Sequence, residues 1–314
     1  MNIGRALVPL AALAGLAALS ACSTAGAGGE DGRLKVTASF YPMQFLAEQI
    51  GGGHVDVTEL TKPGTEPHDL ELTPRQTGEL GESDVIVYLK GLQPAVDDAI
   101  AQSGVENTVD AAALTPLEDH GTEVDGHDHD HDDDHTGHED AGADPHIWLD
   151  PVRYAEVAEG VGKALAKADP GHEAAYEKNT AALVKKLGAL DTDFRDGLKN
   201  RSSDTFITTH AAFGYLAERY GLVEQAISGI DPESEPSAAR MRTLHTLAED
   251  KGVSTVFFET LASDRTARTL AGDLGLKTAV LDPIEGITDK SAGRDYFEVQ
   301  HGNLQALRAA LGAK

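Results

Sequence analysis

The chain is poor in cysteine and in basic residues. Cys22 is the only cysteine among 314 residues, which excludes an intramolecular disulfide framework. Lys and Arg number 26 against 52 Asp and Glu, and the formal net charge is −26 at pH 7. Because nucleic-acid-binding proteins use Lys and Arg to displace counterions from phosphates, this balance argues against a nucleic-acid partner.

The N-terminal apolar stretch is too short to cross a membrane. It runs from Ala6 to Leu19, whereas a spanning helix needs roughly 20 residues. The stretch follows Arg5 and precedes small residues, a pattern typical of a secretory signal. The sequence therefore predicts a signal peptide over residues 1–21 and an exported protein.

The last residues of this signal predict a lipid anchor. Leu19-Ser20-Ala21-Cys22 resembles the lipobox of bacterial lipoproteins, in which cleavage precedes the cysteine and the cysteine is lipidated. Small and polar residues follow, so residues 22–33 are expected to be a lipidated, flexible tether. The expected location is the outer face of the cytoplasmic membrane or the periplasm. The alternative is an incidental cysteine in an ordinary signal peptide.

Residues 118–140 have six histidines and eleven carboxylates, without any Lys or Arg. Imidazoles and carboxylates bind transition-metal cations, and a segment this polar has too little apolar surface to order itself. We predict a mobile metal-collecting loop with weak auxiliary sites; the alternative is a solvated acidic linker. The auxiliary ligands would be His120, His127, His129, His131, His135 and His138.

Short apolar segments alternate with helical stretches on both sides of this loop. The pattern predicts an α/β fold of two lobes, each a mainly parallel sheet covered by helices. The expected lobes are residues 34–170, which include the loop, and residues 201–314. Expected strands are 34–39, 55–60, 84–89, 205–209, 225–230, 254–259 and 277–282; helices are expected near Pro42, after Thr73, and over 211–220, 237–251 and 264–274.

The segment between the two lobes has a different sequence pattern. From Pro151 to about Lys199 the chain has no convincing strand and one break, at residues 169–171. After the break, apolar residues recur at three- and four-residue spacings, as on one face of a helix. We predict one long, rigid connecting helix over residues 171–200, roughly 38 Å long at 1.5 Å per residue.

Three histidines outside the loop occur where one element gives way to another. They are His68 in PGTEPHDLELTP, His146 in DPHIWLDP, and His210 in TFITTHAAFGYL. In open α/β sheets, ligands bind at the carboxyl ends of strands, where such residues converge. We also expect Asp144, two residues before His146, to orient an imidazole.

Several segments in this order resemble a known family, the substrate-binding lipoproteins of bacterial zinc and manganese ABC importers, the cluster A-I solute-binding proteins. The resemblance covers the chain from about Leu34 to the C-terminus. It implies two α/β lobes joined by a rigid helix, with one metal ion in the cleft between them. The matching segments include SFYPMQFLAEQIGG, PGTEPHDLELTP, SDVIVYLKG, DPHIWLDP, THAAFGYLAERYGL, SGIDPESEPS, VFFETLAS and LDPIEGIT.

The resemblance implies a ligand set of His68, His146, His210 and Asp282. Glu66 and water remain alternatives to Asp282. Three imidazoles and one carboxylate suit four-coordinate Zn²⁺, whereas Mn²⁺ prefers more oxygen ligands and octahedral geometry. Manganese-specific members usually have a glutamate in place of His210, so His210 favours zinc.

The resemblance also implies a function. We expect a monomer that binds Zn²⁺ as transported substrate and delivers it to an ABC permease with its ATPase. A Mn²⁺ or Fe²⁺ importer protein of the same family is the alternative. A secreted zinc hydrolase is a weaker one, because the sequence has no HExxH motif, no Gly-rich phosphate loop and no Ser or Cys nucleophile setting.

Overall fold

The computed structural model of the protein describes Met1 and residues 32–120 and 143–314. The predicted signal peptide after Met1, Cys22 and nearly all of the tether lie outside the described residues. So do five of the six predicted auxiliary ligands, His127, His129, His131, His135 and His138. None of the helices in the described part of the chain has the length and apolar character needed to cross a membrane.

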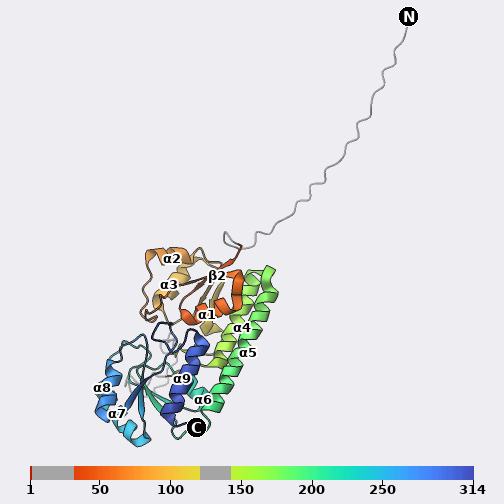
Figure 1. The fold of residues 1–314 in the computed structure, drawn as a ribbon. Helices are drawn as coiled ribbons and strands as arrows, with labels where there is room; N and C mark the ends of the chain where they lie inside the picture. Colours follow the sequence, from red (N-terminus) through yellow and green to blue (C-terminus); the bar gives the residue numbers. More distant parts are fainter. Residues whose placement is uncertain (2–31, 121–142) are drawn as a thin grey trace, which may run out of the picture.

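The first lobe contains a four-stranded parallel sheet of order β2-β1-β3-β4. One side of this sheet is covered by α1 and the other by α2 and α3 (Figure 1). The elements of this lobe are β1 (Leu34–Ala38), α1 (Tyr41–Gly51), η1 (Gly52–His54), β2 (Val55–Glu59), α2 (Pro74–Leu80), β3 (Val85–Tyr88), α3 (Pro94–Ser103), β4 (Thr108–Asp110) and η2 (Ala111–Ala113).

The second lobe repeats this arrangement. Its parallel sheet has the order β6-β5-β7-β8, so in both lobes the second strand lies outside the first and the third and fourth follow on the other side. Its elements are β5 (Thr205–Thr208), α6 (Gly214–Tyr220), β6 (Val223–Ala226), α7 (Ala238–Lys251), β7 (Thr255–Phe258), α8 (Arg265–Leu274), β8 (Lys277–Val280) and α9 (Tyr296–Leu311).

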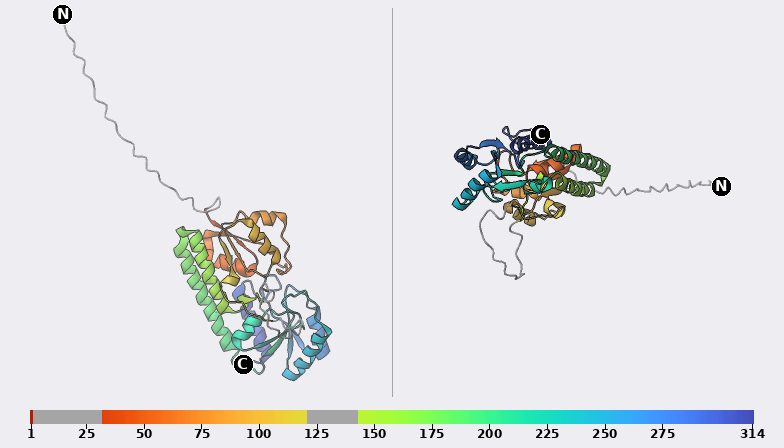
Figure 2. Two further views of the ribbon diagram at one scale, coloured as in Figure 1. Left: turned by 180° about the vertical axis from the view of Figure 1, so that it is seen from behind. Right: turned by 90° about the horizontal axis from the view of Figure 1, so that it is seen from below.

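Two helices run alongside both lobes. After the short η4 (Ile147–Leu149) come α4 (Pro151–Ala168), η5 (Pro170–His172) and α5 (Glu173–Gly197). Figures 1 and 2 show α4 and α5 side by side along the whole molecule. The 25-residue α5 agrees with the predicted long helix, and α4 packs against it, so the connection between the lobes is a helical hairpin.

Strand residues alternate between two cores because successive side chains of a strand point to opposite faces. In β3, Val85 and Val87 belong to the large core that extends through both lobes, whereas Ile86 packs with α2 and α3. In β7, Phe257 joins the large core and Val256 packs with α7 and α8. Both sheets are therefore buried on both faces, as the continuous apolar strands predict.

The predicted α/β class with two parallel-sheet lobes is confirmed. One strand was misplaced: the segment expected over 225–230 pairs over Val223–Ala226 and then turns away. Another was missed, because β4 has only three residues and pairs with β3 alone. Such short edge strands carry too few residues for an alternation pattern to stand out.

Candidate metal site

His68 lies on the loop between β2 and α2, where the carboxyl end of a strand meets the second lobe. Its backbone N–H donates to Glu66 Oε1 at 3.1 Å. The loop is held by Gln93, whose Nε2 donates to Thr61 Oγ1 at 3.0 Å and to the Pro67 carbonyl at 3.2 Å. The His68 side chain retains 11% exposure, so water reaches this edge of the site.

His146 lies just before η4 and is buried. Asp144 Oδ1 accepts from the His146 backbone N–H at 2.9 Å and from Nδ1 at 2.7 Å. Asp144 thus orients the ring so that Nε2 points into the cluster, as expected from the sequence. The neighbouring Trp148 donates from its indole N–H to the Pro283 carbonyl at 2.6 Å, which ties this segment to the turn after β8.

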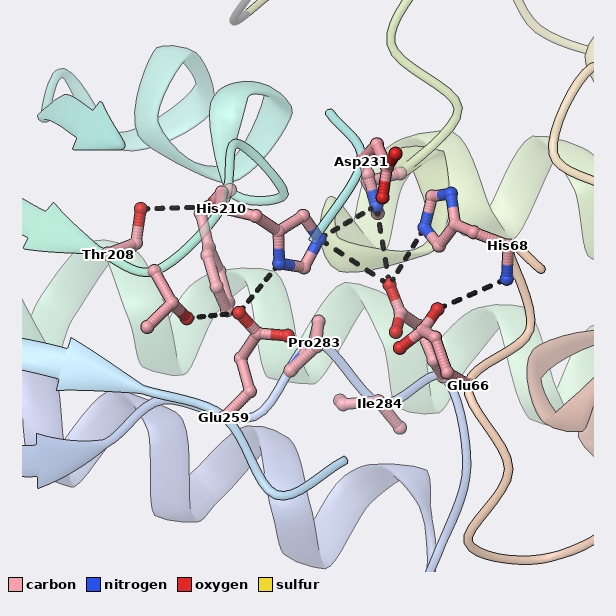
Figure 3. A network of polar contacts seen from close by, with 12 residues as sticks. Glu66, His68, Thr208, His210, Asp231, Glu259, Pro283 and Ile284 are labelled. Atoms are coloured by element: carbon pink, nitrogen blue, oxygen red, sulfur yellow. Dashed lines mark hydrogen bonds and ion pairs between the residues drawn. The ribbon is translucent and has the colours of Figure 1, made fainter. Parts of the chain in front are cut away.

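His210 follows β5 and is also buried. Its Nδ1 donates to Glu259 Oε1 at 2.7 Å, and the Thr209 hydroxyl contacts the same oxygen. Glu259 directly follows β7, the neighbouring strand of the same sheet. Figure 3 shows nitrogens of the His68 and His210 rings directed toward the same place, with Glu259 bonded to the His210 ring. The planes of the two rings are nearly perpendicular, at 84°.

A buried carboxylate, Glu285, completes the group. Its Oε1 lies 3.4 Å from Nε2 of His68, 3.4 Å from Nε2 of His146 and 3.7 Å from Nε2 of His210. His146 Nε2 and His210 Nε2 are 3.4 Å apart. Four ligand atoms at Zn–N distances near 2.0 Å in a tetrahedron lie ~3.3 Å from one another. The arrangement therefore fits one four-coordinate ion.

The turn after β8 explains why Glu285 and not Asp282 faces the histidines. Asp282 Oδ1 accepts from the Ile284 N–H at 2.8 Å, and Asp282 exchanges two backbone hydrogen bonds with the Asn303 side chain of α9. Ile284 has φ of 59°, a strained value for a β-branched residue. Asp282 thus stabilises the turn that presents Glu285.

The structure groups Glu285, rather than the expected fourth ligand Asp282, with the three histidines. The ligand atoms of His68, His146, His210 and Glu285 all lie within 4.8 Å of one another, and Asp282 is not in the group. Glu66, the other candidate, is bonded to the backbone of His68 instead. Burial and the nearby Glu285 raise the pKa of Glu66 to about 8, which disfavours its anionic form.

The charges in the group also favour a cation. Although burial opposes ionisation, the three imidazoles hold the pKa of Glu285 well below its usual range. Burial alone would lower the pKa of His146, but the nearby carboxylates of Asp144 and Glu285 raise it to about 9. Glu259 raises the pKa of His210 in the same way, against burial. Zinc binding therefore displaces protons from the imidazoles of His146 and His210, and the ion takes their place beside the Glu285 carboxylate.

Several buried atoms in the group lack a hydrogen-bond partner among the described residues. They are His68 Nε2 and both carboxylate oxygens of Glu285. Buried polar atoms are nearly always hydrogen-bonded, so orphaned atoms that converge on one point indicate a bound ion. The fold and this group together define a two-lobed metal-binding protein whose site lies where the lobes meet.

Comparisons with known proteins assign the family. Residues 36–310 match the family described as ZnuA, zinc-uptake complex component A periplasmic. Zinc-binding protein AdcA of Streptococcus pyogenes serotype M3 is 37% identical over 295 residues, which cover 88% of this chain and 56% of that protein. High-affinity zinc uptake system protein ZnuA of Bacillus subtilis is 35% identical over 294 residues, covering 92% and 91%. The chain belongs to the ZnuA family.

Solved structures agree with this assignment. Zn(II)-bound AdcA from Streptococcus pneumoniae superposes with a TM-score of 0.74 and 32% identity, covering 90% of this chain and 59% of that one. The metal-dependent lipoprotein YcdH from Bacillus subtilis has a TM-score of 0.73 and 33% identity, covering 89% and 99%. The chain spans only a little over half the length of the streptococcal AdcA proteins.

Sequence reasoning missed Glu285 and Glu259. Both follow strands, as His68 and His210 do, and Glu285 occurs in the quoted segment LDPIEGIT. In the sequence, they are marked only by their positions after the strands β8 and β7. Asp282 also follows β8, so this position does not distinguish Glu285 from Asp282. Of the predicted auxiliary ligands, only His120 is described, and it lies beside Asp144 rather than in the four-residue group.

Proposed function

We propose that the protein captures Zn²⁺ outside the cytoplasmic membrane and delivers it to an ABC permease with its ATPase. The observation that carries this proposal is the convergence of three imidazoles and one carboxylate at tetrahedral spacing. Relatives named for zinc uptake or zinc binding support it. Zn²⁺ is then the transported substrate.

Zinc is favoured over Mn²⁺ and Fe²⁺ by the donor set. Manganese prefers carboxylate, carbonyl and water ligands in octahedral geometry. A group with three imidazoles, two of them oriented by carboxylates, has few oxygen donors and suits the d¹⁰ ion. His210 remains the residue expected to set this preference.

The same group of three histidines and Glu285 favours a metal-binding function over a catalytic one. Catalytic zinc keeps an open coordination position for water, with a general base nearby. The four proposed protein ligands would fill a tetrahedron, and the neighbouring carboxylates Asp144 and Glu259 are bonded to the histidine rings. We propose that the protein is not an enzyme and acts as a monomer anchored by a lipid on Cys22.

Uptake of radioactive zinc by cells tests this proposal. Cells that lack the chain should take up zinc poorly at limiting concentrations, and the natural chain should restore uptake. A chain with His210→Ala should not restore it, whereas Glu249→Gln, on the exposed side of α7, should. Restoration by the His210→Ala chain, or restored manganese uptake instead, would overturn the proposal.

A further inference from the structure

Trp148, the only tryptophan of the chain, contacts two separate parts of the candidate metal site. It is fully buried and lies two residues after His146, and the centroids of the two rings are 5.1 Å apart. Its indole N–H donates to the carbonyl of Pro283, two residues before Glu285, at 2.6 Å. One side chain therefore connects the segment that carries His146 to the turn that carries Glu285, although these segments are distant in sequence.

Trp148 is itself held in place by both lobes. Its ring packs edge-on against Phe40 of the first lobe, with centroids 5.0 Å apart and ring planes at 71°. Its backbone carbonyl accepts from the Tyr296 hydroxyl, at the start of α9, at 2.6 Å. Closely packed, fully buried side chains have little room to change rotamer. The indole N–H is therefore fixed relative to the turn after β8.

That turn needs contacts from outside to keep its shape. Ile284, between Pro283 and Glu285, has φ of 59°, and a β-branched residue keeps such a conformation only where its surroundings hold it. Asp282 holds the turn from within, through the Ile284 N–H. The bond from Trp148 holds it from the side of His146. Without the indole donor, the carbonyl of the buried Pro283 loses this partner, which destabilises the turn.

The spacing between His146 and Glu285 bears on the choice of metal. His146 Nε2 and Glu285 Oε1 are 3.4 Å apart, the separation of two ligands on one tetrahedral ion. Mn²⁺ prefers octahedral geometry with more oxygen ligands. To bind it, the group must open and admit a second carboxylate oxygen or water. A turn held at Pro283 resists this opening.

We propose that Trp148 is a positioning residue for metal selectivity, which favours zinc over manganese by holding the Glu285 turn close to His146. It acts through the Pro283 carbonyl and is not a ligand. His210 supplies the third imidazole, whereas Trp148 keeps the group too small for further oxygen ligands. This inference rests on the proposed zinc capture and adds a source of its selectivity.

Trp148→Phe tests this role because it keeps a buried aromatic ring and removes the indole donor. Chelator competition with the full chain measures the affinities for zinc and for manganese. Zinc affinity should fall about tenfold, the effect of one hydrogen bond, while manganese affinity stays the same or rises. Bound Co²⁺ gives a second readout, because tetrahedral Co²⁺ absorbs visible light far more strongly than octahedral Co²⁺. This absorption should weaken in the variant as the group opens.

A second variant keeps the volume of the indole ring. In Trp148→benzothienylalanine, sulfur replaces the indole N–H, and the residue can be incorporated at this one position because the chain has no other tryptophan. It should show the same loss of zinc preference even if Trp148→Phe fails to fold. Tyr154→Phe is the matched control: it removes a buried donor to the Pro42 carbonyl, so it should lower the Tm of the metal-free chain and leave the zinc preference unchanged.

The outcomes separate this inference from the proposed function. Equal losses of zinc and manganese affinity in the Trp148 variants, or no loss of zinc affinity, would overturn the positioning role alone. Unweakened Co²⁺ absorption in both variants would also overturn it. A natural chain that binds no zinc tightly, or that prefers manganese, would overturn the proposed function instead.

Discussion

The two lobes have the same strand order but contribute unequally to the candidate metal site. The second lobe supplies His210 and Glu285, both buried. The first lobe supplies His68, which is partly exposed, on the loop between β2 and α2. His146 comes from the segment before α4, at the junction.

The supporting contacts differ in the same way. Nδ1 of His146 is bonded to Asp144 and Nδ1 of His210 to Glu259, whereas the His68 ring has no hydrogen bond among the described residues. Oriented ligands lose little freedom when an ion binds. The comparison teaches that the second lobe and the junction form the preorganised part of the site, and that His68 completes it.

The largest expected effect is that of His210→Ala. Four-ligand zinc sites bind with about 10–16 kcal/mol, so one imidazole accounts for roughly a quarter, or about 100–1,000-fold in affinity. Chelator competition with purified chain measures this loss. A loss below about tenfold would mean that the second lobe does not dominate the site.

Glu285→Gln should come next and should exceed Asp282→Asn. The first substitution removes the one anionic ligand of the group, and we expect about a 100-fold loss of zinc affinity. The second retains an acceptor for the Ile284 N–H and should cost about tenfold or less. The same competition assay ranks the two variants. The reverse ranking would restore Asp282 as the fourth ligand.

His68→Ala should cost less than His210→Ala, about 10–100-fold, because water can replace a ligand at the exposed edge of the site. Titration of both variants under one buffer condition makes the comparison. If the two losses are equal, the lobes contribute equally, and the unequal division described above is wrong.

Of these substitutions, Glu224→Gln should change zinc binding least. Glu224 contacts Thr208, close to His210 in the second lobe. The Thr208 hydroxyl lies 2.9 Å from the His210 carbonyl and 2.7 Å from Glu224 Oε1. A hydroxyl has one proton to donate, so Glu224 must donate to Thr208 if Thr208 donates to His210. Burial raises the pKa of Glu224 to about 7, which favours this protonated form. Glu224→Gln preserves the chain of donors, and zinc affinity should change by less than about threefold.

The raised pKa of Glu224 also predicts that the stability of the fold depends on pH. The folded state holds the Glu224 proton up to about pH 7, whereas an unfolded glutamate loses it near pH 4.3. Folding therefore binds a proton in this window, and the contribution of Glu224 to the free energy of unfolding falls as pH rises through it. Thermal unfolding of the metal-free chain between about pH 5 and 8 should show a shallower decline for Glu224→Gln. An unchanged slope would show that Glu224 is ionised in the folded state.

The sequence was sufficient for the fold class and for bringing three histidines together. His68 and His210 follow strands of two different sheets, and in each sheet the parallel strands carry such residues to the carboxyl edge, where the lobes meet. It was insufficient for choosing between Asp282 and Glu285, which lie three residues apart on one turn. That choice depends on Asn303 of α9, a contact distant in sequence. Glu259 and Glu224 were missed for the same reason, because they reach the His210 segment from neighbouring strands.

Competition between zinc and manganese for the full natural chain tests the four-ligand site most directly, with both metals counted per chain after removal of weakly bound ions. Three imidazoles and Glu285 in a tetrahedral arrangement predict one retained zinc ion that a large excess of manganese does not displace. Retention of manganese in place of zinc, or of no ion at all, would contradict the assignment of this group as a zinc site.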